Sequence, residues 1–337
     1  MATPAPEASL RLVSQEAVGY LIGLLVLVTV TASAAGVGEA PAFETFALIF
    51  SSIVIEALPF ILLGALVSAV LGVYVPARLF DRIGRLPLAL QVPGAALSGF
   101  AFPVCECGSV PVARRLMKRG VHPAAGIAFM LASPVLNPLV LASTWIAYGG
   151  GETGGEMVAG RALLGLATAA VVGLALGRDA GELLRARPHE LDHAHAHDGD
   201  GGRVGRGGAF ADHVVSDFLF MGKFIVLGAG LSALLQTAVP ETVIGALGGT
   251  PVLSALTLML VAFVLSLCSE ADAFIAASFT AFAPAAQLAF LVFGPIADTK
   301  LAVLYGATFR RWFVLRLVLV AVPVILLGSL VFEGVVR

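Results

Sequence analysis

The chain has 337 residues, of which 58% are hydrophobic and 12% charged, and its formal net charge is −2. A soluble domain carries about a quarter charged residues, so this chain has too few charges to cover a water-facing surface and is expected to face lipid. The near-neutral charge argues against a nucleic-acid partner, and three cysteines in so long a chain argue against a secreted disulfide scaffold.

Seven stretches are apolar over the roughly 20 residues that a membrane-spanning helix needs. In chain order they are 17–35, 46–75, 121–147, 157–176, 214–239, 287–308 and 313–331. Two shorter stretches, 87–104 and 251–266, run into polar, small-residue breaks and are predicted to be arms of broken or re-entrant hairpins. We expect an all-α polytopic membrane protein with about seven spanning helices and two broken hairpins. The first stretch lacks a clean cleavage site and is expected to be a retained helix.

Basic residues are distributed unevenly among the predicted loops. They follow the second span and the Cys105–Gly108 segment, and they lie between the last two spans. The loops without Lys or Arg are 36–44, 148–156, 240–250 and 281–286. Because basic loops stay in the cytoplasm, we expect an inner-membrane protein with a cytoplasmic N-terminus and an external C-terminus.

The long polar stretch 178–212 separates two halves of the chain. It is rich in Gly, Arg, Asp and His and has no apolar periodicity, which is typical of a disordered cytoplasmic linker. Its four histidines could gather a divalent metal or could simply be solvated: His189, His193, His195 and His197. The predicted organisation is a first helix within 1–42, a first repeat over 43–177, the linker, and a second repeat over 213–337.

The two halves share a constant register. Residues 60–65 (FILLGA) match 224–229 (FIVLGA). The register continues through Pro87 with Pro251, Glu106 with Glu270 and, after a short deletion, Asn137 with Asp298. Under the loop-charge topology the halves run in opposite directions, which makes this an inverted repeat. Secondary transporters use the discontinuous helices of such repeats to bind substrate near the midplane.

The first predicted break is 103–111 (PVCECGSVP), where two prolines and a glycine make continuous helix costly. On an extended backbone Cys105 and Cys107 can point the same way and bind one soft centre, such as trivalent arsenic, copper(I) or zinc. Glu106 at membrane depth costs about 2.5–3.5 kcal/mol unless it is paired or protonated. The alternative is two small buried cysteines beside a snorkelling glutamate.

The second predicted break is 267–272 (LCSEAD), which places Cys268, Glu270 and Asp272 after an apolar arm. If the two breaks meet, three thiols and two glutamates surround one point. That set suits an arsenical through sulfur, or a divalent ion such as zinc through mixed sulfur and carboxylate ligands. Mid-membrane carboxylates could also carry protons. Asn137 is assigned to the substrate site, and three further residues are assigned to coupling, support or structural ties: Asp272, Asp298 and Lys300.

These motifs resemble those of the predicted permeases that include the ArsP-type organoarsenical efflux proteins. The resemblance rests on 102–111 (FPVCECGSVP), 132–138 (ASPVLNP), 267–274 (LCSEADAF) and 294–300 (GPIADTK). It covers most of the chain outside the first helix and the linker. It implies a bacterial inner-membrane permease, some of whose relatives export trivalent organoarsenicals through paired thiols, and it implies a thiol role for Cys105 and Cys107. Members often carry a small or polar residue between these cysteines, so Glu106 raises the prospect of a cationic substrate.

Three functions therefore stay open. The first is proton-driven export of a thiophilic substrate, most readily a trivalent organoarsenical. The second is transport of zinc, copper or cobalt, with metal ligands Cys105, Glu106, Cys107, Cys268 and Glu270. The third is a membrane thiol oxidoreductase, which the C-x-C spacing disfavours.

No enzyme activity and no cofactor are expected. The sequence has no nucleotide-binding glycine loop with its lysine, so direct ATP drive would need a separate subunit. The expected partners are the lipid bilayer, the cargo and protons, and the chain could form a homo-oligomer.

Overall fold

The computed structural model describes residues 41–101, 104–178, 183–184, 206–238, 250–310 and 312–336. Within them every regular element is a helix, apart from one isolated bridge between Leu184 and Phe309, which confirms the all-α prediction. The first half forms α2 (Pro41–Val73), α3 (Ala77–Gly84), α4 (Leu88–Ser98), α5 (Glu106–Lys118), α6 (Pro123–Leu136), α7 (Pro138–Ala147) and α8 (Gly151–Leu176). The second half forms α10 (Arg206–Ala238), α12 (Pro251–Leu265), α13 (Asp272–Ser278), α14 (Pro284–Phe293), α15 (Thr299–Thr308) and α16 (Trp312–Val336).

Five segments of the described chain are long and apolar enough to cross a membrane: Phe43–Val73, Pro123–Ala147, Gly151–Leu176, Gly207–Thr237 and Trp312–Val336. Their outward faces are apolar, as lipid requires. On α16, for example, Leu315, Leu319, Leu327 and Val331 recur at multiples of four residues and are all exposed. The multi-pass membrane prediction is confirmed, while the predicted first span at 17–35 lies outside the described residues.

Two of the predicted spans are interrupted. The prediction of a continuous helix over 287–308 is wrong, because α14 ends at Phe293 and α15 begins only at Thr299. The segment 121–147 breaks at Asn137, whose ψ of 128° is not helical. The following Pro138 disfavours the α conformation at the residue before it and has no N–H to donate, so the helix must restart there.

The two predicted breaks are present, but their limits differ. The second break spans residues between Leu265 and Asp272, close to the prediction. In the first, α5 already begins at Glu106, with Cys105 as its N-cap, so much of 103–111 is helical. The first N–H groups of a helix need no partner within it, and a helix can therefore restart directly after a break. The expectation that Cys105 and Cys107 share an extended backbone is thus wrong.

The predicted linker 178–212 is shorter at its C-terminal end than expected, because α10 begins at Arg206. At its other end Leu183 is buried, and the backbone N–H of Arg310 donates to the Leu183 carbonyl. The four linker histidines lie outside the described residues.

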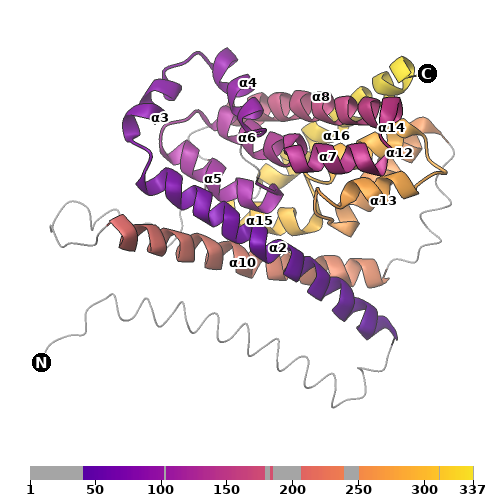
Figure 1. Ribbon diagram of the computed structural model, residues 1–337, viewed down its shortest axis with the longest axis horizontal. Coiled ribbons are helices and arrows are strands. Elements are labelled where there is room, and N and C mark those ends of the chain that lie inside the picture. The colour runs from indigo at the N-terminus through magenta and orange to yellow at the C-terminus, as the bar shows by residue number, and fades with distance from the viewer. Residues whose placement is uncertain are drawn as a thin grey trace, which may run out of the picture.

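The first long helices of the two halves, α2 and α10, lie side by side and antiparallel (Figure 1). Near one end the Ser68 hydroxyl donates to Asp217 over 2.8 Å, and near the other Phe50 lies 3.9 Å from the β-carbon position of Gly230. These contacts join the C-terminal part of α2 to the N-terminal part of α10, and the reverse.

The last long helices, α8 and α16, are antiparallel as well. Gly160 of α8 lies against Phe332, and Leu164 lies against Gly328. Both halves also follow one order: a long helix, two interrupted segments and a second long helix. Equivalent helices that pack antiparallel are what an inverted repeat requires.

Candidate functional site

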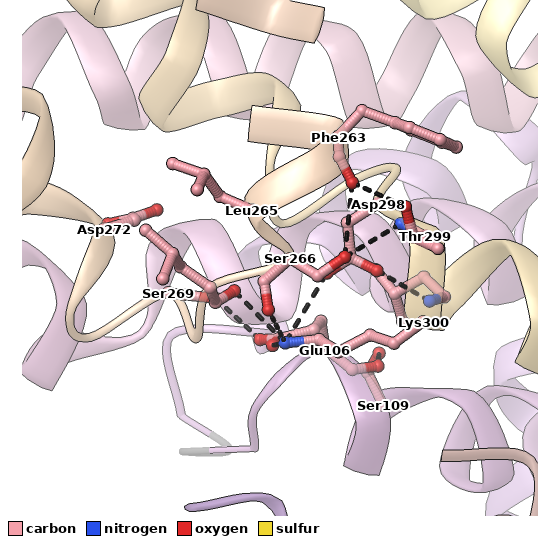
Figure 2. Close-up of polar contacts among 12 residues, drawn as sticks. Glu106, Ser109, Phe263, Leu265, Ser266, Ser269, Asp272, Asp298, Thr299 and Lys300 are labelled. Atoms are coloured by element: carbon pink, nitrogen blue, oxygen red, sulfur yellow. Dashed lines mark hydrogen bonds and ion pairs between the residues drawn. The ribbon is translucent and has the colours of Figure 1, made fainter. Parts of the chain in front are cut away.

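Three of the four helix breaks meet in one buried cluster (Figure 2). Glu106 is the first residue of α5, Ser269 lies in the break between α12 and α13, and Lys300 lies in the first turn of α15. Their side chains point toward one another from segments far apart in the sequence. The cluster is built where backbone is unwound, and such backbone is tolerated at membrane depth only within protein or around a cavity.

Lys300 is the centre of this cluster and its side chain is only 2% exposed. Its Nζ lies 3.0 Å from Glu106 Oε1 and 3.5 Å from Asp298 Oδ2. The same amine donates to the backbone carbonyls of Ser266 at 3.0 Å and Leu267 at 3.2 Å. Four oxygens thus surround one ammonium group, which carries three N–H donors.

Glu106 is held from both sides. Its Oε2 accepts from the Ser269 hydroxyl over 2.7 Å, while Oε1 faces Lys300. Its position at the start of α5 also favours a negative charge, because helix N-termini carry partial positive charge. The Ser109 hydroxyl donates to the Glu106 carbonyl and to Met130 of α6, which fixes the start of α5.

The break between α14 and α15 is fastened to the break after α12. The Thr299 N–H donates to the Ser266 hydroxyl over 3.0 Å, and the Thr299 hydroxyl donates to the Phe263 carbonyl. Asp298 caps α15 by accepting from Leu301 N–H over 2.6 Å. Ser266 has φ 48°, the left-handed region, and is the one such non-glycine residue in the described chain. This turn directs consecutive carbonyls toward Lys300.

Asn137 occupies the equivalent position in the first half. It caps α7 by accepting from Leu139 N–H over 3.0 Å, just as Asp298 caps α15. The two residues paired by the repeat therefore both cap the helix that restarts after a break. A direct role of Asn137 at the substrate site stays a prediction.

A second buried ion pair joins the cluster through Ser269. The guanidinium of Arg161, on α8, is fully buried and binds both oxygens of Asp272, at 2.9 and 2.7 Å. It also donates to Thr144 of α7 and to the Ser269 carbonyl. Asp272 thus pairs with Arg161 and lies to one side of the lysine cluster in Figure 2. The sequence reasoning missed Arg161, although a lone arginine inside the span 157–176 is itself a signal of an intramembrane site.

The three cysteines are free, and each is at most 4% exposed. Cys107, in the first turn of α5, lies beside the thiol of Cys105, and Glu106 and Lys300 are its charged neighbours. The neighbours of the Cys268 thiol also include Lys300, Glu106 and Cys105. The thiols of Cys107 and Cys268 therefore both lie near Lys300 and Cys105.

Glu270 differs from the other acidic residues of the helix breaks. Both of its carboxylate oxygens are buried, and neither has a hydrogen-bond partner among the described residues. Its charged neighbours include Glu106 and Lys300. It lies in the α12–α13 break, between Ser269 and Asp272, as a carboxyl group whose charge nothing described here balances directly.

The acidic and sulfur groups are not spaced as a metal centre. Among the described residues no group of three or more His, Cys, Asp or Glu side chains could hold a metal ion. The alternative of a divalent-metal site at these residues stays a prediction that this arrangement does not favour.

Comparison with known proteins identifies relatives over most of the chain. A family model described as a predicted permease, ArsP_1, matches residues 42–334. The chain is 40% identical to the UPF0718 protein YcgR of Bacillus subtilis over 287 residues, which is 85% of this chain and 96% of that protein. It is 35% identical over 281 residues, 80% of this chain and 89% of the relative, to a protein of Streptococcus mutans named a putative two-component membrane permease complex subunit. No solved structure matches the chain.

Proposed function

This chain belongs to the predicted permease family whose model covers residues 42–334, and on that premise we propose that it exports a thiophilic substrate, a trivalent organoarsenical. The substrate leaves across the inner membrane in exchange for protons. The observation that supports the proposal is that three free, buried cysteines lie at two of the helix breaks, two at the start of α5 and one between α12 and α13.

The thiols are the groups of this site that can bind a soft cargo. Lys300 and Ser269 already engage the two oxygens of Glu106. Glu106 therefore needs no cationic cargo to balance its charge, which removes the main reason for favouring a metal ion. Thiols prefer soft centres such as trivalent arsenic over hard cations.

The binding chemistry balances without an oxidant or a reductant. A monosubstituted arsenical carries two hydroxyl groups on As(III). Each thiol of Cys105 and Cys107 exchanges one hydroxyl for an As–S bond, and its proton leaves with that hydroxyl as water. The thiol of Cys268 then exchanges with one of these As–S bonds, and its proton passes to the displaced cysteine, which gives the cargo a route between the two halves.

The test uses proteoliposomes that contain the purified chain. In the Cys105→Ala/Cys107→Ala variant we expect methylarsenite flux and methylarsenite binding to fall at least tenfold, because both bonds to arsenic are lost. The matched control is Val110→Ala, a buried truncation on the same helix α5, which should retain both.

Binding is measured beside flux for a specific reason. The Streptococcus mutans relative is named a complex subunit, and a missing second subunit could silence flux without affecting the binding site. Unchanged binding and unchanged flux in the double cysteine variant would refute the proposal. Flux of zinc, copper or cobalt that depends on the same cysteines would support the metal alternative instead.

A further inference from the structure

Thiol chemistry does not explain the surroundings of Lys300. Two backbone carbonyls and two carboxylates face its ammonium group, at distances from 3.0 to 3.5 Å. An ion pair with Glu106 would need only one of these four oxygens. The remaining three, from two other segments, form a shell around a single positive charge.

This shell has the construction of a monovalent cation site. Its carbonyls come from the residues directly after α12, where the helix end carries partial negative charge. Transporters with inverted repeats coordinate sodium ions or protons with unwound carbonyls and half-helix C-terminal ends of this kind. Here the left-handed Ser266 turns the chain at that end, and its hydroxyl is held by Thr299.

The backbone of Lys300 is held against α10. A β-carbon on Gly228 of α10 would lie 2.6 Å from the Lys300 Cα, so the two helices touch at this position. The outer oxygens of the carboxylates are satisfied elsewhere, Glu106 by Ser269 and Asp298 by Leu301 N–H. The inner oxygens, Glu106 Oε1 and Asp298 Oδ2, face the ammonium nitrogen.

We propose that the Lys300 ammonium is a tethered cation, which occupies a monovalent cation site formed by Ser266, Leu267, Glu106 and Asp298. A permanent occupant removes the need for a free sodium or potassium ion in the transport cycle. In a variant that lacks the lysine side chain, we expect the site to bind a small monovalent cation. This inference concerns the ion and does not depend on the identity of the cargo.

The experiment measures thermal unfolding of the purified full chain in detergent. The Lys300→Ala variant is titrated with NaCl, KCl and LiCl against N-methylglucamine chloride at constant ionic strength. We expect one of the small cations to raise its unfolding temperature by several degrees, because an ion that binds only the folded state stabilises it by mass action. The wild type should show no difference among the salts.

Two further variants make the result decisive. Lys300→Ala/Glu106→Gln lacks a charged ligand and should lose at least tenfold in cation affinity. Lys223→Ala serves as the matched control, because Lys223 is an exposed lysine of α10 that lies over the rings of Phe220 and Phe224. It should respond to the salts as the wild type does.

A second small substitution covers the case in which Lys300→Ala is not recovered. Lys300→Ser adds one oxygen to the same shell and should be recovered and stabilised by the same ion. If either variant folds and no small cation distinguishes itself from N-methylglucamine, the proposal is overturned. It is equally overturned if neither variant is recovered in any of the salts, since an ion then cannot replace the amine. Neither result bears on the binding of methylarsenite by the thiols.

Discussion

At the scale of single residues, the pairing of Glu106 with Lys300 bears on whether Glu106 is a ligand for a cationic substrate. A glutamate between two cysteines suggests a cation ligand when only the sequence is considered. In the folded chain its oxygens are engaged by Lys300 and Ser269. A buried charge with a partner is a fixed part of the protein, and under the proposed function the selectivity of the site belongs to the thiols.

This pairing predicts a large stability effect. Glu106→Gln leaves the buried ammonium of Lys300 without its nearest carboxylate, and breaking a buried ion pair costs about 3–5 kcal/mol. Because Asp298 remains 3.5 Å away, we expect a loss near the lower value in thermal or denaturant unfolding.

The double variant Glu106→Gln/Lys300→Met provides the control for that measurement. It removes both charges and fills the space of the lysine stem, so it should recover much of the lost stability. A double variant that is no more stable than Glu106→Gln would show that the two side chains do not act as a pair.

At the scale of elements, two glycines matched by the repeat let a long helix pack closely against the start of a short helix in each half. A β-carbon on Gly64 of α2 would lie 2.4 Å from the Cα of Gly108, next to Cys107. Its counterpart Gly228 has the same relation to Lys300. The repeat therefore places a long helix of each half directly against a segment that carries a site residue.

This close approach predicts that Gly64→Ala destabilises the protein. The clash is with backbone, which cannot rotate away, and overpacking of this kind costs about 1–3 kcal/mol. The matched control is Gly222→Ala on α10, where a β-carbon would meet nothing within 4 Å. That change should be neutral or stabilise by up to about 1 kcal/mol, since alanine favours helix over glycine. Equal unfolding temperatures for the two variants would contradict the packing argument.

At the scale of the whole molecule, the antiparallel pairs α2 with α10 and α8 with α16 frame the site from both sides. Inverted halves let one fixed site open alternately to either face of the membrane. Two ion pairs tie the breaks together across these halves: Glu106 joins α5 to α15, and Arg161 joins α8 to α13. Glu270 is the carboxyl group at this junction that neither pair uses.

Coupling to protons is therefore predicted to depend on Glu270. A buried carboxylate without a partner is costly, and taking up a proton relieves that cost. In Glu270→Gln proteoliposomes we expect methylarsenite flux to lose its response to an imposed pH gradient, while thiol-dependent binding persists. The control is Glu152→Gln, an exposed carboxylate at the start of α8. A response like that of the wild type in Glu270→Gln would assign coupling to another group.

The arrangement of helices was largely predictable from the sequence, for local reasons. Long apolar runs can only be helices in a bilayer, since every backbone group must be paired internally. Proline and small polar residues mark where such helices stop, which located the break after Leu265 closely. The interruption at Gly294–Asp298 was harder to predict, because its apolar flanks together reach the length of a span.

The sequence by itself determined that this is an all-α membrane protein with two matched halves and a thiol-bearing break in each, because composition, periodicity and register act along the chain. Only the tertiary structure decided the partners. Ser269 meets Glu106 across 163 residues, and Arg161 meets Asp272 across 111. Such pairs are set by how separate helices pack, and no local pattern encodes them. For that reason the sequence named Glu106 and Lys300 as separate candidates, and the fold made them a single ion pair.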